Sequence, residues 1–468
     1  MPFTSVLFVL FLTIVVVLNY LIPVSNRWIL LLLTSILFYA YLDVVYIPVI
    51  FSVIIVTWYA GRLLENSSED KKSVTLGAAI TGLVLILLFF KYGPRFSLQN
   101  SPVHFSSQDD SAGLLAPLGL SYIMLQAIGY LIEIRNGNHV SEKHLGYLSA
   151  FFLFFPKVIA GPVERAHHFL PVLRKRPSFR YEDISQGLKL IVWGLFKKLV
   201  VANRLAIYTG TIFDDVDQHS GVTLLVAVVF YLFQLYADLS GYTDMARGFA
   251  RLLGFNLAIN FKFLFLSKSL TQFWKRWHIS LSGWFIDYIY TPLVATRQKG
   301  VFITGALSIT FIAYGFWHQA SNLFLLFGAI HGILLSIEHL IRLGFKGPSN
   351  KAMKFIGQLC GPLYTFTIIA FSLIFFKAVN FDQAITIIRK IALLNGPFFQ
   401  DQLSLTLFSL LGIGFLLMVE IKRGNFSNRA NLSSSKYWLV RNCLYFFLLV
   451  AILIAGVFDG PGFIYAKF

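Results

Sequence analysis

Two histidines, His318 and His331, are the only ionisable residues in the apolar stretch FWHQASNLFLLFGAIHG at 316–332. A neutral imidazole can take up and return a proton near neutral pH, because its unperturbed pKa is about 6.5. On one unbroken helix, their separation would turn the two side chains by about 220° and place them ~20 Å apart. The two histidines are therefore not expected to act on one substrate atom.

A helix break between the two histidines is the better interpretation of this stretch. Ser321 and Asn322 are good N-cap residues, which predicts that His318 ends one helix and that His331 lies inside the next. A histidine at a helix end can bond the exposed backbone carbonyls there. The residues alone therefore favour a structural role for His318.

His331 is the stronger candidate for chemistry. Counted from a helix start at Asn322, it lies about ten residues or ~15 Å deep, near the middle of a bilayer. An ionisable group at that depth is a functional candidate by default. The small neighbours Gly328 and Gly332 would let another backbone or a slender ligand approach it.

A second candidate segment, SKSLTQFWKRWHISLSGWFIDYIYTPL at 267–293, opens with a capping box formed by Ser269 and Gln272. The apolar residues that follow recur at helical spacing, at Leu270, Phe273, Trp274 and Trp277. This pattern predicts an amphipathic helix at the membrane interface, with basic residues on the opposite side. His278 follows Trp274 by four positions and is predicted to lie near the aromatic face.

The segment 233–254 carries two carboxylates, Asp238 and Asp244, beside an apolar run. Asp244 and Arg247 are spaced i,i+3 and can neutralise each other on a helix. A structural ion pair is the favoured interpretation of these two residues, and lining of a polar cavity is the alternative.

Gly and Pro interrupt the segment 154–180, which ends in a dense basic run. A re-entrant or broken helix and a cytoplasmic loop with positive-inside charge explain it about equally well. The adjacent His167 and His168 are expected to be loop residues.

These segments must be positioned by a membrane domain. The 468 residues are 57% hydrophobic and 13% charged, with a mean hydropathy of +0.70, which is typical of a polytopic membrane protein. Apolar runs predict an all-α fold with about 11 transmembrane helices plus re-entrant and interfacial helices. The 46–60 and 146–160 runs are shorter or Pro-broken candidates. We predict a single membrane domain over 1–468, because polar connections are too short for a soluble core.

The net charge of +17 does not indicate nucleic-acid binding, because the basic residues occupy short loops between apolar runs. The sequence contains no His, Cys or carboxylate set with zinc spacing, no Gly-rich phosphate loop and no G-x-S-x-G motif. No metal is therefore expected, and acyl transfer would rely on histidine without a local serine nucleophile.

Four segments together resemble the membrane-bound O-acyltransferases, in their bacterial branch of alginate O-acetylation and teichoic-acid D-alanyl transfer proteins. The matching pieces are FFPKVIAGPVER at 154–165, YADLSGYTDMARG at 236–248, FWKRWHISLSGWFIDYIYTPL at 273–293, and FWH with GAIHG within 316–332. The resemblance implies the fold of that family, with the acyltransferase core at about 150–335.

The resemblance also implies roles for single residues. It makes His331 the catalytic histidine and His278 a second conserved polar position, and it leaves a functional role for His318 open. The residues expected to line the channel or support the histidines are Trp274, Trp277, Asp238, Asp244, Asp287, Asn322 and His318. Gln319 and Asn322 depart from the branch's usual pattern, which concerns substrate more than chemistry.

The implied function is a bacterial multi-pass enzyme of the inner (plasma) membrane that passes an acyl group, acetyl in this branch, outward for O-acylation of a cell-surface polysaccharide. The donor would be acyl-coenzyme A or an acyl-carrier thioester, with no permanently bound cofactor. The expected partners are membrane lipids and an extracytoplasmic SGNH-type acetyltransferase or polysaccharide assembly proteins, with no nucleic acid. The alternatives are D-alanyl transfer to teichoic acid, lipid or protein acylation, and a transporter or flippase that uses the buried His and Asp residues as a relay.

Overall fold

The structure is a computed structural model that describes residues 2–98, 117–295, 300–344, 351–399, 403–425 and 438–464. Within these ranges the regular elements are all helical. The chain groups into two compact units, one formed by Met1–Ile191 and Thr243–Ala258, the other mainly by Val192–Tyr242 and Ile259–Ile464. The long helix α10 (Gly221–Leu252) contributes residues to both.

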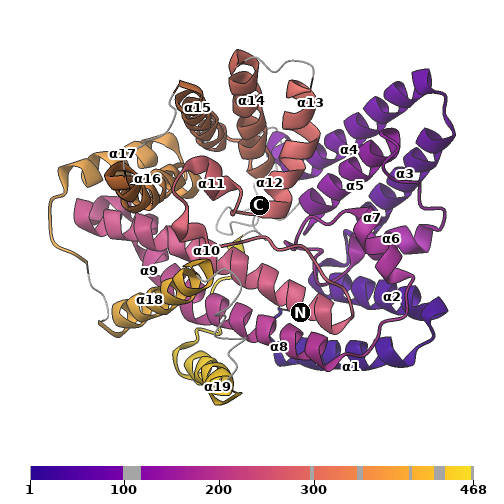
Figure 1. Ribbon diagram of the computed structural model, residues 1–468, viewed down its shortest axis with the longest axis horizontal. Helices are drawn as coiled ribbons and strands as arrows, with labels where there is room; N and C mark the ends of the chain where they lie inside the picture. Colours follow the sequence, from indigo (N-terminus) through magenta and orange to yellow (C-terminus); the bar gives the residue numbers. More distant parts are fainter. Residues whose placement is uncertain are drawn as a thin grey trace. The chain divides into compact units, whose positions relative to one another are not determined.

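The first unit is built from helices that follow one another along the chain (Figure 1). They are α1 (Val6–Leu21), α2 (Val24–Asp43), α3 (Ile47–Asn66), α4 (Glu69–Leu98), α5 (Leu120–Arg135), α6 (Leu145–Leu153), α7 (Ala166–Leu173) and most of α8 (Tyr181–Leu195). The Pro- and Gly-broken segment lies here, since α6 ends before a turn and α7 begins only at Ala166. The chain is non-helical from Phe154 to Arg165, between these two short helices. His167 and His168 lie in the first turn of α7, so their assignment to a loop was wrong.

The second unit holds the remaining segments expected to do chemistry. Its short or irregular elements are η2 (Phe196–Ala202) and η5 (Ile286–Tyr290), both π-helical, and the helices α11 (Leu270–Trp274), α12 (Ile279–Phe285) and α13 (Thr291–Val294). Its longer helices are α9 (Asn203–Asp214), α14 (Gly300–His318), α15 (Asn322–Gly344), α16 (Lys351–Lys377), α17 (Phe381–Leu393), α18 (Leu403–Asn425) and α19 (Trp438–Ala455). Single π-helical turns inserted in α-helices are frequent at functional sites.

Eight helices of the described residues are long and apolar enough to cross a membrane, and two shorter apolar helices, Val6–Leu21 and Asn442–Ala455, accompany them. The all-α membrane fold is thereby confirmed, whereas the number of 11 spans is not. The 46–60 run is part of the full-length helix α3, because Pro48 lies in the first turn, where it is tolerated. The apolar run that begins near Gly187 is divided among α8, η2 and α9 and does not form one long helix.

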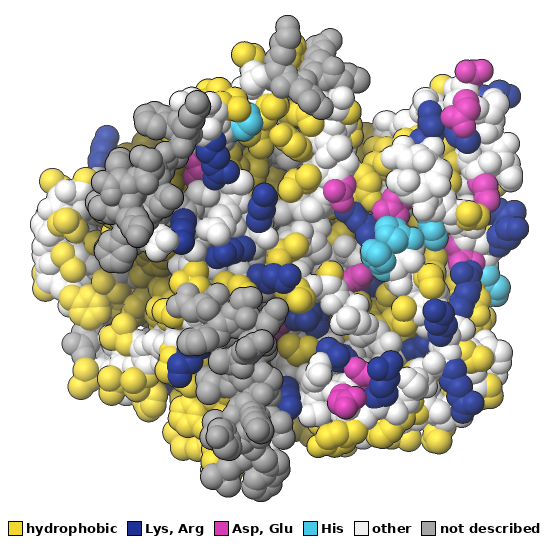
Figure 2. Space-filling view, viewed as in Figure 1, with side chains coloured by type: hydrophobic (Ala, Val, Ile, Leu, Met, Phe, Trp, Pro, Cys, Tyr) yellow, Lys and Arg dark blue, Asp and Glu magenta, His cyan; other side chains and the backbone are white. Residues whose placement is uncertain are grey.

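Hydrophobic side chains cover much of the helix surfaces, and exposed Leu, Ile, Val and Phe occur on almost every long helix. Such surfaces suit contact with lipid. On the face shown in Figure 2, Lys and Arg side chains are spread widely, and several histidines form one group. In the first unit the rings of His167 and His168 lie 4.1 Å apart, and His167 Nδ1 is 2.8 Å from Glu133 Oε2.

The predicted break between the two histidines of the 316–332 stretch is confirmed. Helix α14 ends at His318 and α15 begins at Asn322. The two helices lie side by side (Figure 1) and run antiparallel, since Gly315 approaches Phe324 while Gly332 approaches Ser308. This pair is the scaffold on which the histidine site is built.

Candidate active site

His331 lies fully buried at the tenth position of α15, as its spacing from the helix start predicted. Its ring is surrounded by aromatic side chains, with ring centroids 4.6 Å from Phe327 and 5.1 Å from Trp274. Water is largely excluded from such a pocket. A polar group there needs protein partners to satisfy its hydrogen bonds.

Both ring nitrogens of His331 have such partners. Trp274 Nε1 donates to His331 Nδ1 at 3.4 Å, and His331 Nε2 lies 3.0 Å from Ser372 Oγ on α16. The Ser372 hydroxyl donates its proton to the Ile369 carbonyl at 2.8 Å. An indole only donates, so this network assigns a neutral imidazole with its proton on Nε2 and its lone pair on Nδ1.

Glycines beside His331 let α14 approach closely. A Cβ on Gly328 would lie 2.3 Å from the Phe311 carbonyl oxygen, and one on Gly332 would lie 2.7 Å from Ser308 Cα. Real Cβ atoms do not come so near to backbone, so both positions require glycine. The small residues flanking His331 thus admit another backbone, as predicted.

Trp274 is the residue that joins α11 to this site. It is buried, and its ring centroid lies 4.9 Å from that of Phe311 and 5.1 Å from that of Tyr314, both on α14. The indole therefore packs between α14 and the His331 imidazole. Of the channel residues predicted from the sequence, Trp274 is the one that the structure brings to His331.

Trp274 also lines a cavity of about 350 Å³. Its walls are mostly apolar and aromatic, and they come from α11, α12, η5, α14 and α15. Basic side chains also line it, namely Lys275, His339 and Arg342. An apolar cavity with a few polar groups is the usual form of a small-molecule site.

His318 lies at the end of α14, as predicted, and is buried. Its ring centroid is 5.4 Å from that of Phe376, which lies 5.7 Å from that of Phe327, the neighbour of His331. The two histidines thus border one aromatic cluster from different helix positions. Each can influence that cluster without sharing a substrate atom.

The helix predicted for 270–278 is shorter in the structure and does not reach His278. Helix α11 ends at Trp274, and His278 has a left-handed backbone, with φ +42° and ψ 55°, directly before α12. A non-glycine residue in that region is strained and occurs where surrounding structure enforces it. Here Asn260 enforces the turn, because its carbonyl accepts from Ile279 N at 2.9 Å and its side chain from Ser280 N at 3.1 Å.

The spacing argument for His278 was therefore wrong, although the side chain is buried and its ring centroid lies 5.9 Å from that of Phe261. Burial lowers the pKa of the His278 imidazole to about 4, which keeps it neutral at physiological pH. Trp277, the other predicted channel residue here, stacks on Phe273 with ring centroids 5.6 Å apart.

The two aspartates of α10 have different surroundings. Asp244 Oδ1 accepts from Arg247 at 3.1 Å, which confirms the i,i+3 ion pair. Asp238 is fully buried and pairs with Lys198 Nζ on η2 at 2.5 Å. Its second oxygen accepts from Ile464 N at 2.8 Å, so this carboxylate holds the segment that follows α19.

Asp287 and Asn322, the last two predicted channel residues, have exposed side chains, on η5 and at the start of α15. Sequence reasoning missed Ser372 and Lys198, since both belong to apolar helices and meet their partners only in the folded chain. Their signal was polarity within an apolar run, which marks a functional or paired residue in a membrane protein.

A family model for the membrane-bound O-acyltransferases matches residues 113–378, which include every residue of this site. The chain belongs to the membrane-bound O-acyltransferase family. It is therefore an acyltransferase, and it is a multi-pass protein of the bacterial inner membrane.

Several curated relatives of this membrane-bound O-acyltransferase match over most of its length. A Pseudomonas putida protein named probable alginate O-acetylase is 32% identical over 394 residues, which cover 82% of this chain and 79% of that protein. The peptidoglycan O-acetyltransferase of Helicobacter pylori is 29% identical, over 78% of this chain and 74% of that protein. The teichoic acid D-alanyltransferase of Bacillus subtilis is 26% identical, over 66% of this chain and 79% of that protein.

Proposed function

We propose that this acyltransferase moves an acetyl group from a cytoplasmic thioester to a hydroxyl acceptor at the outer face, for O-acetylation of a cell-surface polysaccharide. An extracytoplasmic transferase of the SGNH type would complete the transfer. The observation that carries the proposal is a buried neutral imidazole, His331, whose Nδ1 accepts a hydrogen bond from Trp274, a residue that lines a cavity. The relatives named as O-acetylating enzymes support acetyl as the cargo.

The reaction follows from the tautomer of His331. Its Nδ1 lone pair is held only by the long bond from Trp274, so an acceptor hydroxyl can displace the indole and lose its proton to Nδ1. The hydroxyl oxygen then bonds to the acyl carbonyl carbon. As the carbon–sulfur bond breaks, the imidazolium returns that proton to the thiolate. Ser372 holds the Nε2 proton throughout.

The cavity suits the thioester end of the donor. Its apolar and aromatic walls exclude water, and Lys275 and Arg342 provide positive charge at its lining. Coenzyme A and acyl-carrier proteins present phosphates or carboxylates near the thioester arm, and such charges complement basic groups. The donor is a substrate here, and no permanent cofactor is proposed.

The test uses a strain that lacks this gene and is complemented with wild-type protein, His331→Ala or His219→Ala. We expect wild type and His219→Ala to restore base-labile acetate on the surface polysaccharide. His331→Ala should transfer at least about 100-fold less, because positioned acid–base catalysis contributes that much. His219 is a matched control, because its ring packs against Phe399 and not against the residues of the site.

The same cells separate the alternatives. Restoration of D-alanine esters on teichoic acid, with polysaccharide acetate unchanged, would replace acetyl with D-alanyl transfer, which the Bacillus relative's name favours. Unchanged acylation of both polymers would favour a lipid or protein acceptor. Full acyl transfer by purified His331→Ala protein in vesicles would contradict the catalytic role and favour a transporter or flippase.

A further inference from the structure

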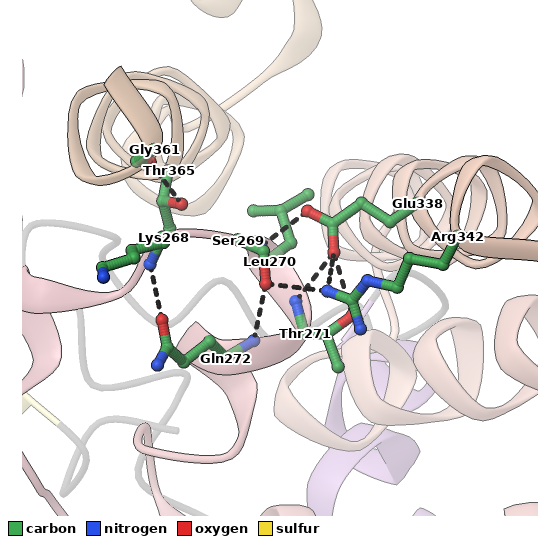
Figure 3. A network of polar contacts seen from close by, with 9 residues as sticks. All are labelled: Lys268, Ser269, Leu270, Thr271, Gln272, Glu338, Arg342, Gly361 and Thr365. Atoms are coloured by element: carbon green, nitrogen blue, oxygen red, sulfur yellow. Dashed lines mark hydrogen bonds and ion pairs between the residues drawn. The ribbon is translucent and has the colours of Figure 1, made fainter. Parts of the chain in front are cut away.

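Helix α11, which carries Trp274, is attached to α15 at its first turn through Glu338 (Figure 3). Glu338 Oε1 accepts from Leu270 N at 2.7 Å, and Oε2 accepts from Thr271 N at 3.1 Å and Thr271 Oγ1 at 2.9 Å. Glu338 is only 9% exposed. Charge-assisted hydrogen bonds of this kind are among the stronger ones in proteins.

Two neighbours complete the attachment shown in Figure 3. Arg342 Nη2 lies 3.4 Å from Glu338 Oε2 and donates to Ser269 Oγ at 2.9 Å. Ser269 Oγ in turn accepts from Gln272 N at 3.2 Å. The amide groups that open a helix normally need outside acceptors, and α11 obtains them from α15 and from its own cap.

The other end of α11 also meets α15. Glu338 follows His331 by seven residues, two turns or ~10 Å along the same face of α15. Trp274 follows Leu270 by one turn and donates to His331 Nδ1. One short helix thus bridges two positions on α15, with the carboxylate at its start and the imidazole at its end.

We propose that Glu338 is a positioning residue for the catalytic reaction: by fixing the first turn of α11 it holds the Trp274 indole against His331. This inference rests on the proposed function, in which the indole keeps the His331 ring in its reactive orientation and moves aside only when the acceptor hydroxyl takes its place at Nδ1. The competing explanation is that Glu338 contributes only to the general stability of the second unit.

The experiment combines Glu338→Gln with Trp274→Phe in a double-mutant cycle. The full-length proteins are reconstituted in vesicles and supplied with the thioester donor and with membranes that carry the acceptor. Glu338→Gln keeps the shape but weakens the bonds to α11, so kcat is expected to fall about 10-fold with the donor KM within about twofold. Misplacement of catalytic groups by about 1 Å costs up to ~100-fold. In the Trp274→Phe background, Glu338→Gln should cost less than about twofold, because residues that act through one another are not additive.

The matched control is Glu420→Gln, which makes the same change at a similarly buried carboxylate. Glu420 lies on α18 and accepts from Tyr236 Oη at 2.6 Å. The kcat of the Glu420→Gln variant should remain within about twofold of the wild-type value. Equal losses from Glu338→Gln in both Trp274 backgrounds, or similar losses in Glu338→Gln and Glu420→Gln, would overturn the positioning role.

A second readout does not need acyl transfer. In protein labelled with 5-fluorotryptophan, the Trp274 resonance is the one absent in Trp274→Phe. We expect His331→Ala, Glu338→Gln and the milder Ser269→Ala to shift this resonance and Glu420→Gln to leave it in place. An unmoved resonance in the folded Glu338→Gln and Ser269→Ala proteins would refute the inference, whereas inactive wild-type protein would refute the proposed function alone.

Discussion

At the scale of single residues, the site depends on how the protons around His331 are distributed. Ser372 is the serine that no local sequence motif indicated, and it lies within hydrogen-bond reach of the imidazole. Its hydroxyl proton is directed to the Ile369 carbonyl on its own helix, so Ser372 accepts from His331 rather than giving up a proton to it. This arrangement is that of an orienting group and not of a nucleophile.

Ser372→Ala is therefore expected to weaken catalysis without abolishing it. A neutral hydrogen bond contributes up to about 1.4 kcal/mol. If its loss raises the activation free energy by that amount, the rate of acyl transfer falls roughly tenfold. The measurement is the initial rate of thiol release from the donor in reconstituted vesicles. Complete inactivity, together with an acylated Ser372 peptide in wild-type protein, would instead identify Ser372 as a nucleophile.

At the scale of helices, the close packing of α14 on α15 determines where His331 lies. The sequence predicted this part well, because Ser321 and Asn322 indicated a helix start where α15 begins, and because Gly328 and Gly332 indicated a close approach of another backbone. The helix predicted for 270–278 failed at His278, since the left-handed turn there depends on Asn260, eighteen residues earlier. Periodicity cannot report a turn that distant residues enforce.

Gly328→Ala tests the helix pair. The added methyl group would meet the Phe311 carbonyl, and overpacking of this kind costs roughly 1–3 kcal/mol. We expect a lower melting temperature of the detergent-solubilised protein and a lower transfer rate, because α14 must move away from His331.

Gly305→Ala is the matched control on α14, since a Cβ there meets no atom within 4 Å. Alanine favours a helix over glycine by up to about 1 kcal/mol, so this variant should melt at the same or a higher temperature. Equal destabilisation by the two substitutions would show that helix propensity and not close approach limits this interface.

At the scale of the whole chain, contacts between distant segments complete the second unit. Lys198 Nζ donates to the carbonyls of Pro461 and Gly462 as well as to Asp238. These partners are separated by up to 264 residues. The sequence identified Asp238 as a buried acid of interest, but its partner and its task of holding the segment after α19 follow only from the fold.

Asp238→Asn should destabilise the protein by roughly 3–5 kcal/mol, because it leaves the buried Lys198 ammonium without a counter-charge. Asp244→Asn on the same helix should cost only about 0.2–0.5 kcal/mol, as its i,i+3 pair with Arg247 is partly exposed. The loss of stability in each variant is measured by thermal melting and by the protease resistance of the 457–464 segment. A similar loss in the two variants would argue against a special role for the Asp238 ion pair.

The position of Trp274 also bears on side reactions. In the proposed mechanism, a thioester bound in the cavity would face the Trp274 indole and not His331 Nδ1, as long as no acceptor has displaced that ring. The indole would then keep water away from His331 Nδ1, so the resting enzyme would protect its donor against hydrolysis. Fidelity of transfer would thus come from a covered base that only a correctly bound acceptor uncovers.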